Sequence, residues 1–133
     1  MARYNWKPVV GSFLTKLIKA KFVLVAVDDG GSRIPVDKKS EAVDAVDSVD
    51  DSHLYVTDPN GFDRWIYIVL GNDPEELVAD YSCRREYDDS EDKVDPLDAV
   101  LDEFTDLWAG KKCPRSDSES RYDAALSAWN KGV

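Results

Sequence analysis

A β-hairpin signal in the middle of the chain constrains the fold more than any other sequence feature. Leu54–Thr57 alternates in polarity like a strand, the four residues 58–61 have the proline and glycine positions of a type I turn, and Arg64–Leu70 follows as a second strand. One face of that second strand carries Trp65, Tyr67 and Val69, and the other carries Ile66, Ile68 and Leu70. Because both faces are apolar, we predict a central strand covered on both sides, at least in part.

Helical periodicity appears on both sides of the hairpin. Apolar residues at helical spacing predict helices over residues 7–20, over 38–49 with Asp37 or Ser40 as N-cap, over 95–109, and over 119–130. The expected buried stripe of the helix over 95–109 consists of Leu97, Val100, Leu101, Phe104, Leu107 and Trp108. Gly110 follows that helix as its expected stop.

The segment after the hairpin is also predicted to be helical. Asp73 is a suitable N-cap, Pro74 occupies the first helical position, and Glu76 stands three residues after the cap. The residues expected on the buried side of this helix are Leu77, Val78 and Tyr81. The highly charged stretch 84–93 then reads as an exposed loop.

Two further strands are expected before the hairpin. Phe22–Val27 is apolar and β-branched and is expected to be a buried strand, residues 28–31 form a turn, and Arg33–Val36 returns as a short strand that Pro35 restricts to a sheet edge. The mixture of helices and antiparallel strands predicts an α+β fold, a small sheet of three to four strands with a central β-hairpin, packed by helices. We expect one domain over 1–133, with 95–133 either part of its core or a helical extension.

The charge balance excludes several classes of partner. Lysine and arginine number 17 and aspartate and glutamate 27, so the net charge is −10. Direct binding to nucleic acid or to an anionic membrane depends on basic residues and is not expected. The longest apolar runs have six residues, whereas a membrane helix needs about 20. We therefore expect a soluble, cytoplasmic protein.

Few residues are suited to catalysis or to metal binding. The single histidine, His53, and the two cysteines, Cys83 and Cys113, lack the paired spacing of zinc ligands, and we expect thiols rather than a disulfide. No cofactor and no metal is predicted. One alternative remains open, a small enzyme or metal-dependent binder that uses carboxylates at strand ends, namely Asp28, Asp29 and Asp73.

Acidic and basic residues are segregated along the chain. Residues 1–21 contain five basic residues and no acid, whereas residues 71–106 contain fourteen acids and three bases. Aspartates spaced by four stack on one face of a helix, which leaves two interpretations open, a solubilising face or a surface for a basic partner. The candidate partner-binding residues are Asp88, Asp89, Glu91, Asp92, Asp98, Asp102 and Asp106.

One stretch resembles a known group of proteins. Residues 22–30, which end in a Val-Asp-Asp-Gly turn, and residues 65–82 resemble short hypothetical proteins of tailed bacteriophages and prophages. That group has a Tyr-Gly-Asn-Asp motif followed by Asp-Tyr-Thr. Here Leu70 stands in place of the tyrosine, and Pro74 in place of a glycine that follows the motif. The resemblance implies a phage or prophage origin and a setting among other phage proteins, and it assigns no activity.

The sequence thus predicts a small acidic phage or prophage accessory protein that is not an enzyme. It would bind a host or phage protein with a basic surface, and inhibition of a nucleic-acid-binding or defence protein is the expected mode of action. The alternatives are the carboxylate enzyme described above and a structural homodimer in which the basic N-terminal helix docks on an acidic face of its mate.

Overall fold

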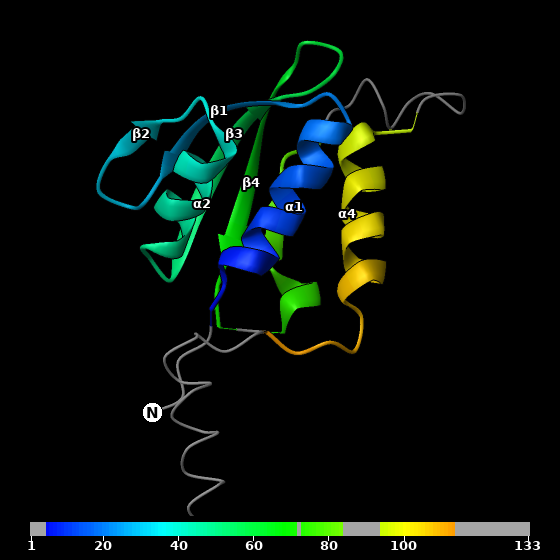
Figure 1. Cartoon of the computed structure of the whole chain (residues 1–133). Helices are drawn as coiled ribbons and strands as arrows, with labels where there is room; N and C mark the ends of the chain where they lie inside the picture. The colour runs from blue at the N-terminus through cyan, green and yellow to red at the C-terminus, as the bar shows by residue number, and fades with distance from the viewer. Residues whose placement is uncertain (1–4, 72, 84–93, 114–133) are drawn as a thin grey trace, which may run out of the picture.

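The computed structural model describes residues 5–71, 73–83 and 94–113. These residues form a five-stranded antiparallel sheet with three helices packed against it (Figure 1). The elements in chain order are α1 (Lys7–Lys19), β1 (Val23–Asp28), β2 (Arg33–Pro35), α2 (Lys39–Asp47), β3 (Asp51–Thr57), β4 (Asp63–Val69), η1 (Pro74–Glu76), β5 (Val78–Tyr81) and α4 (Pro96–Trp108). The α+β class is confirmed, and the sheet has one strand more than the predicted maximum of four.

The predicted hairpin lies at the centre of this sheet. The strand order is β2-β1-β3-β4-β5, and β3 pairs with β4 so that Tyr55 lies opposite Trp65. The backbone amide of Gly61 donates to the carbonyl of Asp58 at 2.9 Å, which closes the predicted turn. Gly61 has a φ of 87°, a left-handed conformation that glycine adopts without strain. The turn chemistry in the sequence therefore sets the register of the two central strands.

The first two strands lie where they are predicted, but β1 is not buried on both faces, because Val23 and Val25 are exposed. β1 continues into a turn and returns as β2, which lies at one edge of the sheet and ends at Pro35. Proline lacks a backbone donor, so it is tolerated where a strand has a neighbour on one side only. A register irregularity in β1 between Leu24 and Ala26 interrupts its strict alternation.

The three helices lie on one side of the sheet and cover it with apolar side chains (Figure 1). The buried face of the two central strands includes Leu54, Val56, Ile66 and Ile68, all of which belong to one core cluster. β4 is a central strand, as predicted, because it lies between β3 and β5, and within the described elements its second face is only partly covered. On the opposite face Trp65 and Tyr67 are only half-buried, because the helices that provide cover all approach from one direction.

The predicted helix after the hairpin is also wrong. Residues 74–76 make a single 3-10 turn, and Val78–Tyr81 forms the edge strand β5 instead. The amide of Val69 donates to the carbonyl of Leu77 at 2.9 Å, and β5 pairs with β4 in antiparallel register. Pairing with β5 provides hydrogen-bond partners for backbone groups of β4 that would otherwise have none. This pairing outweighs the local preference of residues 73–76 to begin a helix.

The helices α1, α2 and α4 match their predicted positions with two corrections. Neither Asp37 nor Ser40 caps α2, whose N-cap is Lys38 with no side-chain cap bond. Leu107 of α4 is 42% exposed rather than buried, because it points into a surface groove. Gly110 ends α4 in the left-handed conformation, as expected. The charged stretch 84–93 and the helix over 119–130 lie outside the described residues.

A membrane-crossing helix is not found in the part of the chain that the structure describes, since none of its helices has the required length and hydropathy.

Candidate interaction surface on helices α1 and α4

The exposed side of α4 carries Asp102, Glu103 and Asp106, which we call the acidic ridge. These residues face solvent because the apolar stripe that begins at Leu97 and includes Phe104 turns the opposite side of the helix into the core. Within the described ranges, Glu103 pairs with a lysine of α1, whereas the side chains of Asp102 and Asp106 make no hydrogen bond or ion pair. Two of the three ridge carboxylates, those of Asp102 and Asp106, are therefore not engaged by any other described part of the chain.

Asp98 does not belong to this ridge, although its spacing predicted that it would. It is half-buried, and its Oδ1 accepts a hydrogen bond of 2.5 Å from the Tyr81 hydroxyl. This bond, followed by burial and the negative charge of Asp98, raises the pKa of Tyr81 above its ordinary value. Asp98 thus joins α4 to the edge strand β5. The other predicted contacts, Asp88, Asp89, Glu91 and Asp92, lie outside the described residues.

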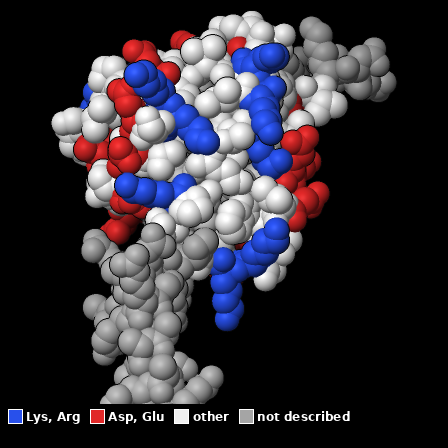
Figure 2. Space-filling view, in the orientation of Figure 1, with Lys and Arg blue, Asp and Glu red and all other residues white. Residues whose placement is uncertain are grey.

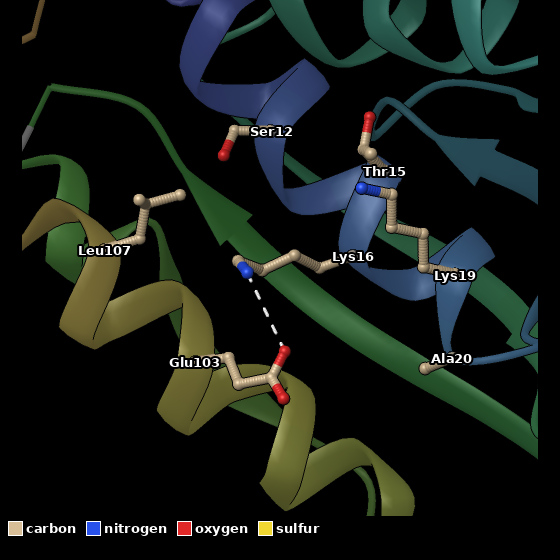
Figure 3. A pocket seen from close by; sticks show the side chains of 7 residues that line it. All are labelled: Ser12, Thr15, Lys16, Lys19, Ala20, Glu103 and Leu107. Atoms are coloured by element: carbon tan, nitrogen blue, oxygen red, sulfur yellow. Dashed lines mark ion pairs between the residues drawn. The ribbon is translucent and has the colours of Figure 1, made fainter.

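A groove runs between α4 and α1 and brings basic residues beside the acidic ridge (Figure 3). Lys16 and Lys19 lie on the last turn of α1, and we call them the basic column. The Nζ of Lys16 lies 3.7 Å from Oε2 of Glu103, across the groove. The residues that line the groove are Ser12, Thr15, Lys16, Lys19, Ala20, Glu103 and Leu107.

A polar contact of partly buried groups fixes the spacing of the two helices below this groove. The indole Nε1 of Trp108 donates to the hydroxyl of Ser12 at 3.1 Å. The ring of Phe104 also packs edge-on against that of Phe13, with 5.2 Å between centroids. The distance between the charged groups of α1 and α4 is therefore set by core contacts, and the surface is preorganised.

Basic and acidic side chains lie side by side on the helix-covered side of the molecule. Figure 2 shows a column of basic side chains over α1, acidic side chains along the edge where α4 lies, and side chains of both charges on the flank where α2 lies. At the other flank of α1, Lys7 pairs with Asp44 of α2 at 3.3 Å. The basic N-terminal segment and the acidic later segment, which are far apart in the sequence, thus become neighbours on one surface.

A buried ion cluster lies at the other end of α4, and the sequence analysis missed it. The guanidinium of Arg64, which is 1% exposed, binds both carboxylate oxygens of Asp95 at 2.9 and 2.7 Å and one oxygen of Asp58 at 3.3 Å. It also donates to the carbonyl of Ser82. Strict alternation places Arg64 on the same strand face as Ile66, and a charge at that position was the available signal.

Arg64 remains charged in this cluster despite its burial. Burial by itself tends to lower the pKa of Arg64, but hydrogen bonding to Asp95 and Asp58 and their negative charges outweigh burial, so the pKa is raised. Asp95 also caps α4 by accepting from the amide of Leu97 at 3.0 Å. The cluster therefore joins the hairpin, the end of β5 and the start of α4.

The carboxylates proposed for an alternative enzyme are not brought together. Asp29 accepts hydrogen bonds from the amides of Gly31 and Ser32, which lower its pKa and give it a role in its own turn. Asp73 lines a different surface depression with Trp6. Among the described residues, no group of three or more histidine, cysteine, aspartate or glutamate side chains is arranged to hold a metal ion.

Histidine and the two cysteines occupy separate environments. His53 lies on the uncovered face of the sheet, where its ring stacks on Tyr67 with 4.7 Å between centroids. Both cysteines are thiols, and Cys83 is exposed whereas Cys113 is buried. Burial, followed by the charge of Asp47, raises the pKa of Cys113 to about 11, which suppresses thiolate formation at neutral pH.

Comparison with known proteins finds no relative. No protein-family model, no curated protein and no solved structure matches this chain.

Proposed function

We propose that this protein is a non-enzymatic binding protein whose acidic ridge on α4 contacts a basic surface of another protein. The observation that carries the proposal is the division of labour among the aspartates. Asp58, Asp95 and Asp98 make contacts that hold the fold together. The side chains of Asp102 and Asp106 are exposed and make no polar contact within the described residues, so these two carboxylates are available to bind a partner.

The proposed mode of binding combines long-range attraction with a small apolar contact. Charges on the ridge would increase the rate of encounter and favour basic partners, since opposite potentials steer diffusional association. Leu107, which is 42% exposed beside Glu103, would supply apolar contact area. Burial of such an anchor contributes to affinity, and the surrounding charges contribute to specificity.

The resemblance of residues 22–30 and 65–82 to short phage and prophage proteins supports a setting for this activity. We place it in the cytoplasm of a bacterial host, where a nucleic-acid-binding or defence protein offers a basic surface that normally receives phosphates. Occlusion of that surface would inhibit the protein. Asp88, Asp89, Glu91 and Asp92, which lie outside the described residues, stay predicted contacts of the same partner.

The test uses a double variant, Asp102→Asn with Asp106→Asn, which removes two ridge charges and leaves Asp98 in place. A tagged wild-type chain first captures binding proteins from a bacterial lysate, and the dissociation constant of the captured protein is then measured at low and high salt. The variant should bind more weakly, and its binding should depend less on salt, because attraction between exposed charges is screened within about 10 Å at 0.1 M salt.

A matched control removes two charges at the start of another helix. Asp37→Asn with Glu41→Gln changes the net charge by the same amount at the start of α2, where both side chains are exposed. This control should bind like the wild type. Equal dissociation constants for wild type and ridge variant at both salt concentrations would overturn the proposal.

A further inference from the structure

We infer that a second copy of this chain is a partner of the acidic ridge, so that α1 and α4 form a self-complementary dimer surface. This inference rests on the proposed function because it names a partner for the same ridge. It depends on three features of the groove, namely the order of its charges, their alignment along the helices and the small side chains that line it.

The order of charges comes from two helices that run side by side. α1 and α4 lie next to each other over the sheet and point in opposite directions (Figure 1). Lys16 and Lys19 stand on one side of the groove between them, and Glu103 stands on the other (Figure 3). The face therefore consists of a basic strip beside an acidic strip.

A two-fold axis makes a face with one basic and one acidic strip complementary to itself. Consider a two-fold axis that lies in the interface and runs along the groove, parallel to both helices. Rotation about such an axis exchanges the two sides of the groove, so the basic column of each copy faces the acidic ridge of the other. An interface of this kind is isologous, with the same patch used twice and two equivalent sets of contacts.

The alignment of charges along the groove is also correct. The same rotation leaves each residue at its original level along the groove. Lys16 and Glu103 are at one level, because their side chains are 3.7 Å apart within one chain. Lys16 of one copy would therefore meet Glu103 of the second copy, and the two intramolecular pairs would become a ring of four alternating charges.

The groove between the strips allows a second helix surface to approach closely. The small side chains of Ser12, Thr15 and Ala20 are among those that line the groove, and Leu107 is the large apolar side chain exposed there. Leu107 of each copy would then pack near the axis. A second copy of this chain offers an acidic strip to Lys16 and Lys19 as well as a basic strip to the ridge, whereas a purely basic partner would engage the ridge alone.

Charge reversal tests the inference directly. One variant carries Lys16→Glu and Lys19→Glu, which makes both strips acidic. Another carries Asp102→Lys and Glu103→Lys, which makes both strips basic. A third carries all four substitutions, which exchanges the strips. The α2 control carries Asp37→Lys and Glu41→Lys, at the start of that helix. Circular dichroism and thermal melts establish that each variant is folded, and sedimentation velocity over a range of concentrations gives the dimer dissociation constant.

The wild type, the four-fold variant and the α2 control should form dimers that dissociate on dilution. The two double variants should each bind themselves at least about tenfold more weakly, and an equimolar mixture of them should form a heterodimer. The Asp102→Lys, Glu103→Lys variant has a net charge of −6, compared with −10 for the wild type. If net charge governed dimerisation, the smaller net charge of this variant would strengthen its dimer. The inferred surface predicts the opposite, a weaker dimer, because both strips are then basic.

Three results would overturn the inference. They are a monomeric wild type at every concentration, double variants that dimerise like the wild type, or a mixture that forms no heterodimer. Its failure is distinguishable from failure of the proposed function. A monomeric wild type whose captured partner is still lost on Asp102→Asn with Asp106→Asn leaves the proposed function standing and removes only the self-association.

Discussion

The two ends of one short stretch of α4 show how differently the same side chain behaves in two surroundings. Asp95 at the start of the helix is 6% exposed and lies against the Arg64 guanidinium, whereas Asp102, two turns later, is exposed on the acidic ridge. A buried carboxylate must be paired, because its desolvation is uncompensated otherwise, whereas an exposed carboxylate is stabilised by water. The buried end of α4 therefore holds the fold, and the exposed side remains available for association.

The first prediction tests the buried end and has the largest expected effect. Arg64→Met removes the cation and leaves Asp58 and Asp95 buried without their shared partner. We expect the free energy of unfolding to fall by about 3–5 kcal/mol, because one broken member of a buried ion pair leaves an uncompensated charge. Chemical denaturation of the variant and the wild type measures this difference.

The control for Arg64→Met breaks an ion pair at the exposed side. Lys16→Met removes the partner of Glu103, whose side chain is 69% exposed. The expected loss is under about 1 kcal/mol, because water and salt screen an exposed pair. Similar losses for the two variants would contradict the contrast between the buried and the exposed ends of α4.

The second prediction concerns Asp98, which is intermediate between the two ends. Tyr81→Phe removes the hydroxyl that donates to Asp98, and we expect a loss of about 1 kcal/mol at neutral pH. Since Asp98 raises the pKa of folded Tyr81, the unfolded state loses its proton first, near pH 10. The contribution of the hydroxyl is therefore complete below about pH 10 and declines as the pH rises above that value.

Denaturation of Tyr81→Phe and the wild type at pH 7.5 and above pH 10 checks this behaviour. The advantage of the wild type should shrink at the higher pH, and lysine titration cancels because both chains share it. If the difference in unfolding free energy between the two chains were the same at both pH values, the protonation of the Tyr81 hydroxyl would not be coupled to folding.

The third prediction concerns the acidic ridge and has the smallest expected effect. Asp102→Asn with Asp106→Asn should leave the free energy of unfolding unchanged or raise it by a few tenths of a kcal/mol. Like charges four residues apart repel weakly, and Asp106 also lies near the negative end of the helix dipole. A loss above about 1 kcal/mol would show that the ridge supports the fold and would assign it to the same class as Asp95.

Much of the fold was predictable because its signals are local. Pro59 and Gly61 specify the central turn within four residues, and helical periodicity marks α1, α2 and α4. The exposed position of Asp102 and Asp106 follows from the same periodicity. These features need no knowledge of distant contacts, so the sequence predicts them correctly.

The features that the sequence analysis missed all depend on partners that are distant in the chain. Residues 78–81 became a strand because the edge of β4 was available for pairing, and Leu107 is exposed because α1 leaves a groove beside it. The contact of Asp98 with Tyr81 spans 17 residues, and that of Arg64 with Asp95 spans 31. Spacing alone groups such aspartates together, and only their tertiary neighbours separate them.

By itself, the sequence of this protein determined the central hairpin, the amphipathic helices and the segregation of basic and acidic residues along the chain. The tertiary structure decided which carboxylates are buried against Arg64, which face of the sheet is covered, and that the basic helix lies beside the acidic one. The physical reason is the separation along the chain over which each interaction acts. Turn geometry and helical period act between near neighbours, whereas burial and electrostatic pairing depend on where the folded chain brings distant residues.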